Sequence, residues 1–149
     1  MFKFFVPENQ IKENNAKIIG EDVKHISNVL RLKKDEQIII CNKDNGKSYI
    51  CRINELNKEY VICKIDAEIK NTTESNVNVD IYQGIPKSDK MEYIIQKTTE
   101  IGVRSVIPVE LARCIAKIDE KSEKKKIDRW QKIAEGAAKQ SKRDRIPKI

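Results

Sequence analysis

The pattern of apolar and polar positions is clearest between Val79 and Val109. A short β-prone run there ends at a glycine and a proline, and a second apolar run closes the stretch. Between the two runs, apolar residues recur at helical spacing, with Ser88 or Asp89 placed to cap the helix and Gly102 to end it. A helix of this length between two strands is typical of a βαβ unit in a parallel sheet. Its buried side is predicted to consist of Met91, Ile94, Ile95, Thr98 and Ile101.

The residues before this stretch carry shorter runs that predict a small β-barrel. An apolar strand at 2–6 precedes a polar stretch at 8–17, interpreted as a loop, and a helix from 20 to 31. Further strands are predicted at 37–41, 47–56 and 60–69, with an Asn-Gly pair favouring a hairpin. Short strands with one small helix indicate a closed or half-closed barrel. Because 70–76 is polar and reads as a linker, we expect domains at 1–72 and 73–149.

One long helix is predicted near the end of the chain, from about 123 to 141. Its buried stripe would contain Ile127, Trp130, Ile133, Ala134, Ala137 and Ala138. Residues 142–149 would begin a further strand. Two parallel strands and two helices bury little surface, whereas an α/β sheet is normally covered on both faces. The sequence therefore predicts an α+β barrel domain followed by the first half of an α/β domain.

Charge adds a candidate partner to this picture. The chain has 149 residues, a formal net charge of +7 and a pI of about 9.2, which suits a polyanion. The whole excess lies in residues 121–149, where 11 basic residues face 4 acidic ones. Such a run indicates either a nucleic-acid surface or an ordinary solvated helix face.

Cysteine and histidine usage argues against a metal site. Four cysteines show no CxxC spacing and His25 is the only histidine, so a zinc site is not expected. Cys41, Cys51 and Cys63 fall in strand-like segments and are predicted to be small core residues. With no signal peptide and no long apolar run, a cytoplasmic protein with reduced thiols and no membrane contact is expected.

Several blocks of sequence carry a family resemblance over essentially the full length. They are MFKFFV at the start, GEDVKHISNVLRLKKDEQI at 20–38, IPKSDKMEYIIQKTTEIGVRSVIPV at 85–109 and KIDRWQKIAEGAAKQSKRDRIPKI at 126–149. With these blocks, the chain resembles the bacterial 16S ribosomal RNA (uracil-N3)-methyltransferase family of the SPOUT or trefoil-knot class. It departs from the family in having Lys24-His25 where a His pair is usual, and Lys142 where Gly usually follows Gln-Ser.

The resemblance implies a PUA-like RNA-binding barrel at 1–72 and the N-terminal part of a SPOUT methyltransferase domain at 73–149. It also implies S-adenosylmethionine as cofactor, a homodimer, and methylation of N3 of one uridine in 16S ribosomal RNA of the small subunit. The family's glycine-rich cofactor loops and knot would lie beyond Ile149. We therefore expect a fragment without cofactor-binding residues that is inactive alone.

Candidate site residues follow from these blocks. Arg113, after the second strand of the βαβ unit, is the candidate catalytic cation that would stabilise the developing uracil oxyanion; the alternative is an exposed loop arginine. RNA contacts are expected from cations of the first helix and of the loop after Gly84, and from the end of the long helix. These are Lys24, Arg31, Lys33, Lys87, Lys90, Gln140, Ser141 and Arg143. The alternatives are surface charge and helix capping.

Two other functions fit the sequence. One is a non-catalytic RNA-binding module that uses only the barrel and the basic helix, with salt-sensitive binding and no cofactor. The other is an interaction protein whose basic helix docks on an acidic partner.

Overall fold

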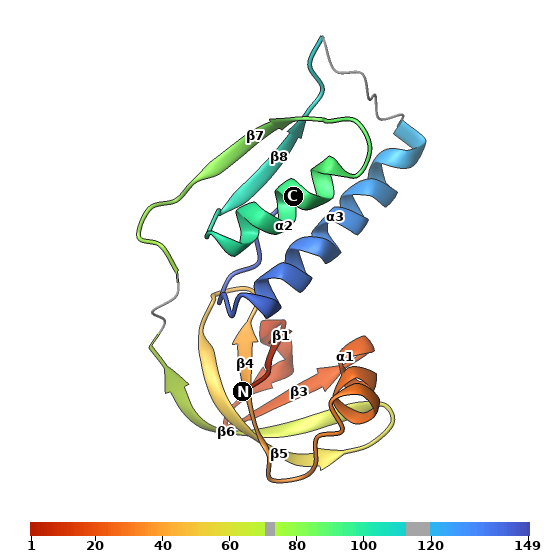
Figure 1. The fold of residues 1–149 in the computed structure, drawn as a ribbon. Coiled ribbons are helices and arrows are strands. Elements are labelled where there is room, and N and C mark those ends of the chain that lie inside the picture. Colours follow the sequence, from red (N-terminus) through yellow and green to blue (C-terminus); the bar gives the residue numbers. More distant parts are fainter. Residues whose placement is uncertain (71–73, 113–119) are drawn as a thin grey trace. The chain divides into compact units, whose positions relative to one another are not determined.

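The computed structural model describes residues 1–70, 74–112 and 120–149. By its internal contacts the chain divides into two compact units, Met1–Thr72 and Thr73–Ile149. Figure 1 shows that the first consists mainly of strands, whereas the second combines a short sheet with two longer helices.

The first unit is a mixed sheet that curves into a half-barrel (Figure 1). Its strand order is β1-β4-β5-β6-β3-β2; β1 is parallel to β4 and the other pairs are antiparallel. Side chains alternate between the core and solvent most clearly along β3, whereas β1 and β4 each end in three consecutive buried residues. The strands are β1 Lys3–Val6, β2 Ile11–Lys12, β3 Asn15–Ile19, β4 Gln37–Asn42, β5 Ser48–Leu56 and β6 Tyr60–Ile69.

The stretch at 8–17 is not the loop that the sequence predicts. It contains a short 3₁₀ turn, η1 at Glu8–Gln10, and then the hairpin β2–β3. Ala16 and Ile18 each expose 1% of their surface, while the residues between and beside them are exposed. The strand was missed because its alternation is short: it rests on Ala16 and Ile18, and the exposed apolar residue Ile19 breaks it.

The helix predicted at 20–31 is a short composite helix. Helix α1 covers Glu21–Lys24 and continues as a π-helical turn, η2, over His25–Val29. Val23 and Ile26 point into the core of the first unit, where they join Ile18, Ile38 and Ile40.

The prediction for the cysteines in the strands is confirmed. Cys41, Cys51 and Cys63 are buried, and none of the three is a disulfide cysteine in the described part of the chain. Burial raises the pKa of Cys51 and the pKa of Cys63 to about 12, so both thiols stay protonated and behave as small apolar groups.

The predicted βαβ unit forms the centre of the second unit. Strands β7 Asp80–Gly84 and β8 Ser105–Val109 pair in parallel, with helix α2 Lys90–Glu100 between them in the chain. Helix α3 Glu120–Gln140 lies beside α2 (Figure 1). Residues after α3 return to the sheet, where Lys148 bridges Ser105 and accepts a 2.9 Å hydrogen bond from the Val106 amide. This bridge lies where a further strand was predicted to begin.

One apolar core holds these elements together. Ile95 of α2, Val106 of β8, and Trp130 and Ala134 of α3 meet in it. Ile101, predicted to be buried, is instead 82% exposed. Helix α2 ends at Glu100 and the chain turns at Gly102 with φ +101°, so Ile101 leaves the buried side of the helix.

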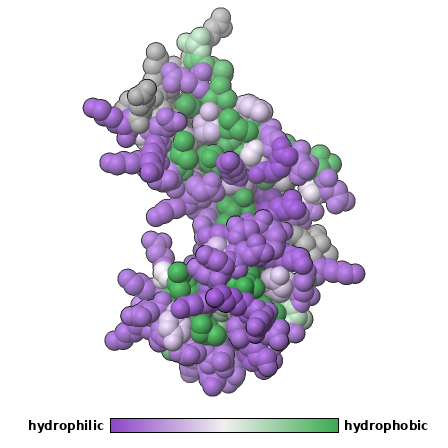
Figure 2. Space-filling model, turned by 180° about the vertical axis from the view of Figure 1, so that it is seen from behind, coloured by the Kyte–Doolittle hydropathy of each residue, from purple (hydrophilic) through white to green (hydrophobic). Residues whose placement is uncertain are grey.

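The face drawn in Figure 2 is mostly hydrophilic, and hydrophobic side chains appear on both units. Seen from behind, the second unit carries a band of hydrophobic side chains (Figure 2). The exposed large apolar residues of this unit include Val77, Val79, Tyr82 and Leu111. No helix in the described ranges is both long enough and apolar enough to cross a membrane.

The core of the second unit can be tested with Ile95→Ala. Ile95 is fully buried, so its truncation should lower the free energy of unfolding by about 2–5 kcal/mol. Trp130 is the only tryptophan and lies in the same core, so its fluorescence during urea denaturation reports on this unit. Ile101→Ala is the matched control and should change stability by less than about 0.5 kcal/mol. Equal losses in both variants would contradict this assignment of the core.

Candidate nucleic-acid interface

A groove of about 590 Å³ lies on the first unit, between the helix α1–η2 and the turn that joins β5 to β6. Three of its lining residues are basic, three are polar and uncharged, and three are apolar; none is acidic. They are Lys24, Arg31, Lys58, Ser27, Asn28, Asn57, Val23, Leu32 and Leu56. The groove therefore combines positive charge with hydrogen-bonding groups and an apolar floor.

The three cations are available to an anionic ligand. Lys24, Arg31 and Lys58 are exposed, and none forms an ion pair within the described part of the chain. Lys24 and Arg31 were both predicted as RNA contacts, and the structure brings them to one groove. Lys33 is also exposed but does not line it.

The helix that forms one wall has an irregular backbone. The Leu30 amide donates to the His25 carbonyl at 2.9 Å, which closes the π turn. Arg31 then adopts a left-handed conformation with φ +53°, and the Leu32 amide donates back to the Ile26 carbonyl at 3.0 Å. Glycine is the usual residue at such a helix end, because other residues are strained there.

The opposite wall is shaped by Asn57, which sequence reasoning treated only as a turn residue. Its side-chain oxygen accepts hydrogen bonds from the amides of Glu59 and Tyr60, each at 2.8 Å. This turn places Lys58 beside the groove. The short gap between the strands predicted at 47–56 and 60–69 was the available signal, but the sequence alone did not show that this turn faces the first helix.

In the second unit, Lys87 and Lys90 lie at the edge of the sheet where ligands collect. Both are exposed, in the loop from β7 and at the first position of α2. The Ile85 amide donates to the Val109 carbonyl at 3.1 Å, which ties this loop to the carboxyl ends of both strands. Lys97, by contrast, pairs with Glu100 at 2.8 Å.

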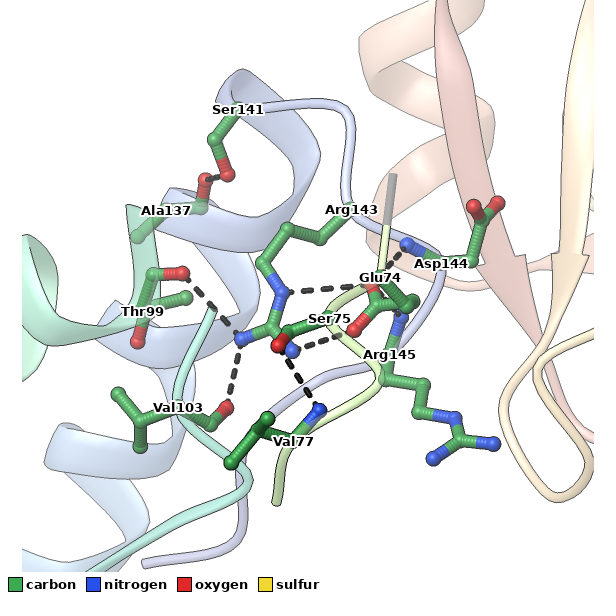
Figure 3. A network of polar contacts seen from close by, with 10 residues as sticks. All are labelled: Glu74, Ser75, Val77, Thr99, Val103, Ala137, Ser141, Arg143, Asp144 and Arg145. Atoms are coloured by element: carbon green, nitrogen blue, oxygen red, sulfur yellow. Dashed lines mark hydrogen bonds and ion pairs between the residues drawn. The ribbon is translucent and has the colours of Figure 1, made fainter. Parts of the chain in front are cut away.

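Arg143, predicted to contact RNA, lies inside the second unit (Figure 3). It is 4% exposed, and its guanidinium donates to both oxygens of Glu74 and to the carbonyls of Thr99 and Val103. This placement argues against an RNA-phosphate contact. The prediction of an RNA contact rested on the positive charge of the segment around Arg143. Such a charge excess does not distinguish a surface arginine from a buried one.

The other residues predicted near Arg143 have mixed placements. The Ser141 hydroxyl donates to the Ala137 carbonyl at 2.7 Å and so caps the end of α3, while Gln140 is exposed. Arg113, the predicted catalytic cation, lies outside the described residues. Among those described, no cluster of His, Cys, Asp or Glu could hold a metal ion.

Glu74 is the acidic residue that pairs with Arg143 in this cluster. It also accepts hydrogen bonds from the backbone amides of Asp144 at 2.8 Å and Arg145 at 3.1 Å. Burial by itself raises the pKa of Glu74, but the hydrogen bonds from Arg143 and from the two amides outweigh it and lower that pKa. The carboxylate is therefore charged in the folded protein at neutral pH.

Two family descriptions match the chain. "RNA methyltransferase domain" matches residues 73–149, and "RNA methyltransferase PUA domain" matches residues 18–66. The groove lies within the first 72 residues, in the unit that carries the PUA match.

Curated and solved relatives agree with these matches. "Ribosomal RNA small subunit methyltransferase E" of Bacillus subtilis is 40% identical over 152 residues, covering 100% of this chain and 59% of the relative. A structure of the enzyme of that name from Neisseria gonorrhoeae, bound to S-adenosyl methionine, is 32% identical with TM-score 0.88, covering 100% of this chain and 61% of that one. A putative methyltransferase from Legionella pneumophila with bound SAM is 30% identical with TM-score 0.85, covering 99% and 60%. The chain thus spans about three fifths of the length of these relatives.

The role of Glu74 can be tested with Glu74→Gln. The change leaves the buried guanidinium of Arg143 without a counterion, so it should lower the free energy of unfolding of the second unit by about 3 kcal/mol at pH 7. Glu92→Gln breaks the more exposed pair with Arg129 and should cost less than about 1 kcal/mol. Urea denaturation followed by Trp130 fluorescence measures both.

The pH dependence gives a second readout of the same experiment. The folded-state pKa of Glu74 is lowered, so the ionised carboxylate stabilises the folded protein. This contribution to the free energy of unfolding is complete above the unfolded-state pKa near 4.5, and it is lost as the pH falls through the lower folded-state pKa. The Glu74→Gln variant should lose this part of the acid sensitivity. An unchanged pH profile would contradict the assignment.

Proposed function

The chain belongs to the RNA methyltransferase family, and on this premise we propose that it serves the S-adenosylmethionine-dependent methylation of N3 of one uridine in 16S ribosomal RNA. The observation that carries the proposal is the match of residues 73–149 to the methyltransferase domain, joined to a PUA unit with a basic groove. In this division of labour the first unit binds RNA and the second contributes to the catalytic domain.

The chemistry explains why cations are needed on the substrate side. N3 of uracil is an imide nitrogen that holds its proton at neutral pH, so its methylation requires removal of that proton and stabilisation of the negative charge on the uracil oxygens. We propose Arg113 for this electrostatic role. Lys87 and Lys90, at the carboxyl edge of the sheet, would hold nearby phosphates in position without reading sequence.

S-adenosylmethionine supplies the methyl group when bound, but we assign none of the described residues to it. Two of the acidic groups of the second unit are already paired: Asp80 with Arg104 and Ser105, and Glu92 with Arg129. The pairing with Arg104 and then with Ser105 lowers the pKa of Asp80, so it is not a candidate base. Further proposals that rest on family membership are a trefoil knot, a homodimer and a cytoplasmic location.

The proposed reaction can be tested in cells. Deletion of the gene that encodes this chain should remove one N3-methyluridine from 16S ribosomal RNA, as measured by mass spectrometry of nuclease-digested RNA. A plasmid copy of the gene should restore the modified nucleoside. Retention of all N3-methyluridine in the deletion strain would contradict the proposed reaction.

The 149 residues alone should bind small-subunit RNA weakly and transfer no methyl group. The matched relatives are longer than the span that this chain covers, and we assign no cofactor contact within it. Incubation with radiolabelled S-adenosylmethionine and small-subunit RNA measures transfer, and a filter-binding titration measures affinity. Binding that weakens steeply with salt supports the RNA role, whereas incorporation of label would show that these residues are sufficient for catalysis.

A further inference from the structure

We propose that the groove of the first unit binds a single unpaired nucleotide of RNA, with its phosphate against Arg31 and its base edge against Asn28. The proposal rests on the RNA-binding role proposed above and specifies which form of RNA the first unit recognises.

The size and floor of the groove suit one nucleotide. Its volume of about 590 Å³ lies within the range of small-ligand sites. Leu32 and Leu56 are partly buried: each packs against the core of the first unit and also lines the groove. They therefore present apolar surface on which the face of a base can lie. Paired bases cannot enter such a groove, because a duplex keeps their faces stacked inside the helix.

The basic residues that line the groove favour an anionic ligand. Lys24, Arg31 and Lys58 approach the groove from two sides, and the lining includes no acidic residue. Because none of these cations is ion-paired within the described ranges, binding of a phosphate breaks no existing pair among them. Arginine suits this role best, since its planar fork can donate two hydrogen bonds to one phosphate.

Asn28 provides the hydrogen-bonding pattern that a base requires. Its side chain is exposed and makes no hydrogen bond to any described residue. The carboxamide offers a donor and an acceptor side by side, which matches the donor–acceptor edge of an unpaired base. Asn57, the other amide of the groove, already accepts hydrogen bonds from two backbone amides, so its role is to shape the wall.

The backbone conformation at Asn28 and Arg31 is a separate indication that this segment has a function. Asn28 lies in the π turn, and Arg31 follows it in a left-handed conformation. π turns and left-handed residues other than glycine are both enriched at functional sites. A glycine at position 31 would make the same turn with less strain. The arginine therefore contributes through its side chain.

Fluorescence anisotropy with the full chain tests the proposal. One labelled oligonucleotide from small-subunit RNA would be offered single-stranded and as a fully paired duplex, at several salt concentrations. The single strand should bind at least tenfold more tightly than the duplex. Arg31→Gly should weaken single-strand binding about tenfold and reduce the slope of log K against log salt by about 0.7. Its melting temperature should equal or exceed that of the unmodified chain.

Two more variants complete the test. Asn28→Ala should weaken single-strand binding about fivefold and leave the salt slope unchanged, because it removes a base contact and no charge. Lys12→Ala removes one exposed charge on β2, outside the groove, and should leave the affinity within about twofold.

The outcomes separate this proposal from the one it rests on. If RNA binds with steep salt dependence but Arg31→Gly and Asn28→Ala behave like Lys12→Ala, the groove is not the site although the RNA-binding role stands. Equal affinity for single strand and duplex would also overturn the nucleotide assignment. Absence of salt-dependent binding to either RNA would overturn the RNA-binding role itself, and binding of an acidic peptide instead would assign the groove to a protein partner.

Discussion

The guanidinium of Arg143 is a buried charge, and the second unit is arranged so that this charge is fully paired. Its ion pair with Glu74 joins the first described residue of the unit to the turn after α3, while the carbonyls of Thr99 and Val103 add the end of α2. The Thr99 carbonyl lies in the last turn of α2 and the Val103 carbonyl in the segment that follows, so one side chain joins both to the turn after α3. The same contacts direct the chain after α3 back toward β8 and the bridge at Lys148. These polar contacts and the apolar core around Ile95 and Trp130 together hold the frame that presents Lys87 and Lys90.

The sequence predicted the periodic elements well and the isolated polar contacts poorly. The parallel β7–β8 pair with α2 between its strands, the strands β4 to β6 and the buried stripe around Trp130 follow from hydrophobic spacing, which local sequence records directly. The hairpin at 11–19 was missed because its inward positions are few and the exposed Ile19 interrupts their alternation with polar residues. Glu74 was assigned to the linker and Arg143 to the RNA surface, since their partnership spans 69 residues and no local pattern reveals it.

The surfaces of the two units fit the different roles proposed for them. The first unit places Lys24, Arg31 and Lys58 around one concave site, although they come from two segments that only the fold brings together. Of these, Lys24 and Arg31 could be predicted from their helical spacing, whereas Lys58 required the β5–β6 turn to be positioned. The second unit belongs to a methyltransferase domain by its sequence match, and its charge excess includes residues such as Arg143 that maintain the fold. Net charge therefore suggested a polyanionic partner, but the charge excess lies in residues 121–149 and not at the groove.

We propose that this chain recognises ribosomal RNA through the groove of its first unit. Hydrogen–deuterium exchange with and without a single-stranded small-subunit RNA tests it most directly, because it reports every described segment at once. Slower exchange on RNA binding is expected in peptides covering 23–32 and 56–58, with little change in β2. Protection confined to other segments, with these two peptides unchanged at saturating RNA, would contradict it.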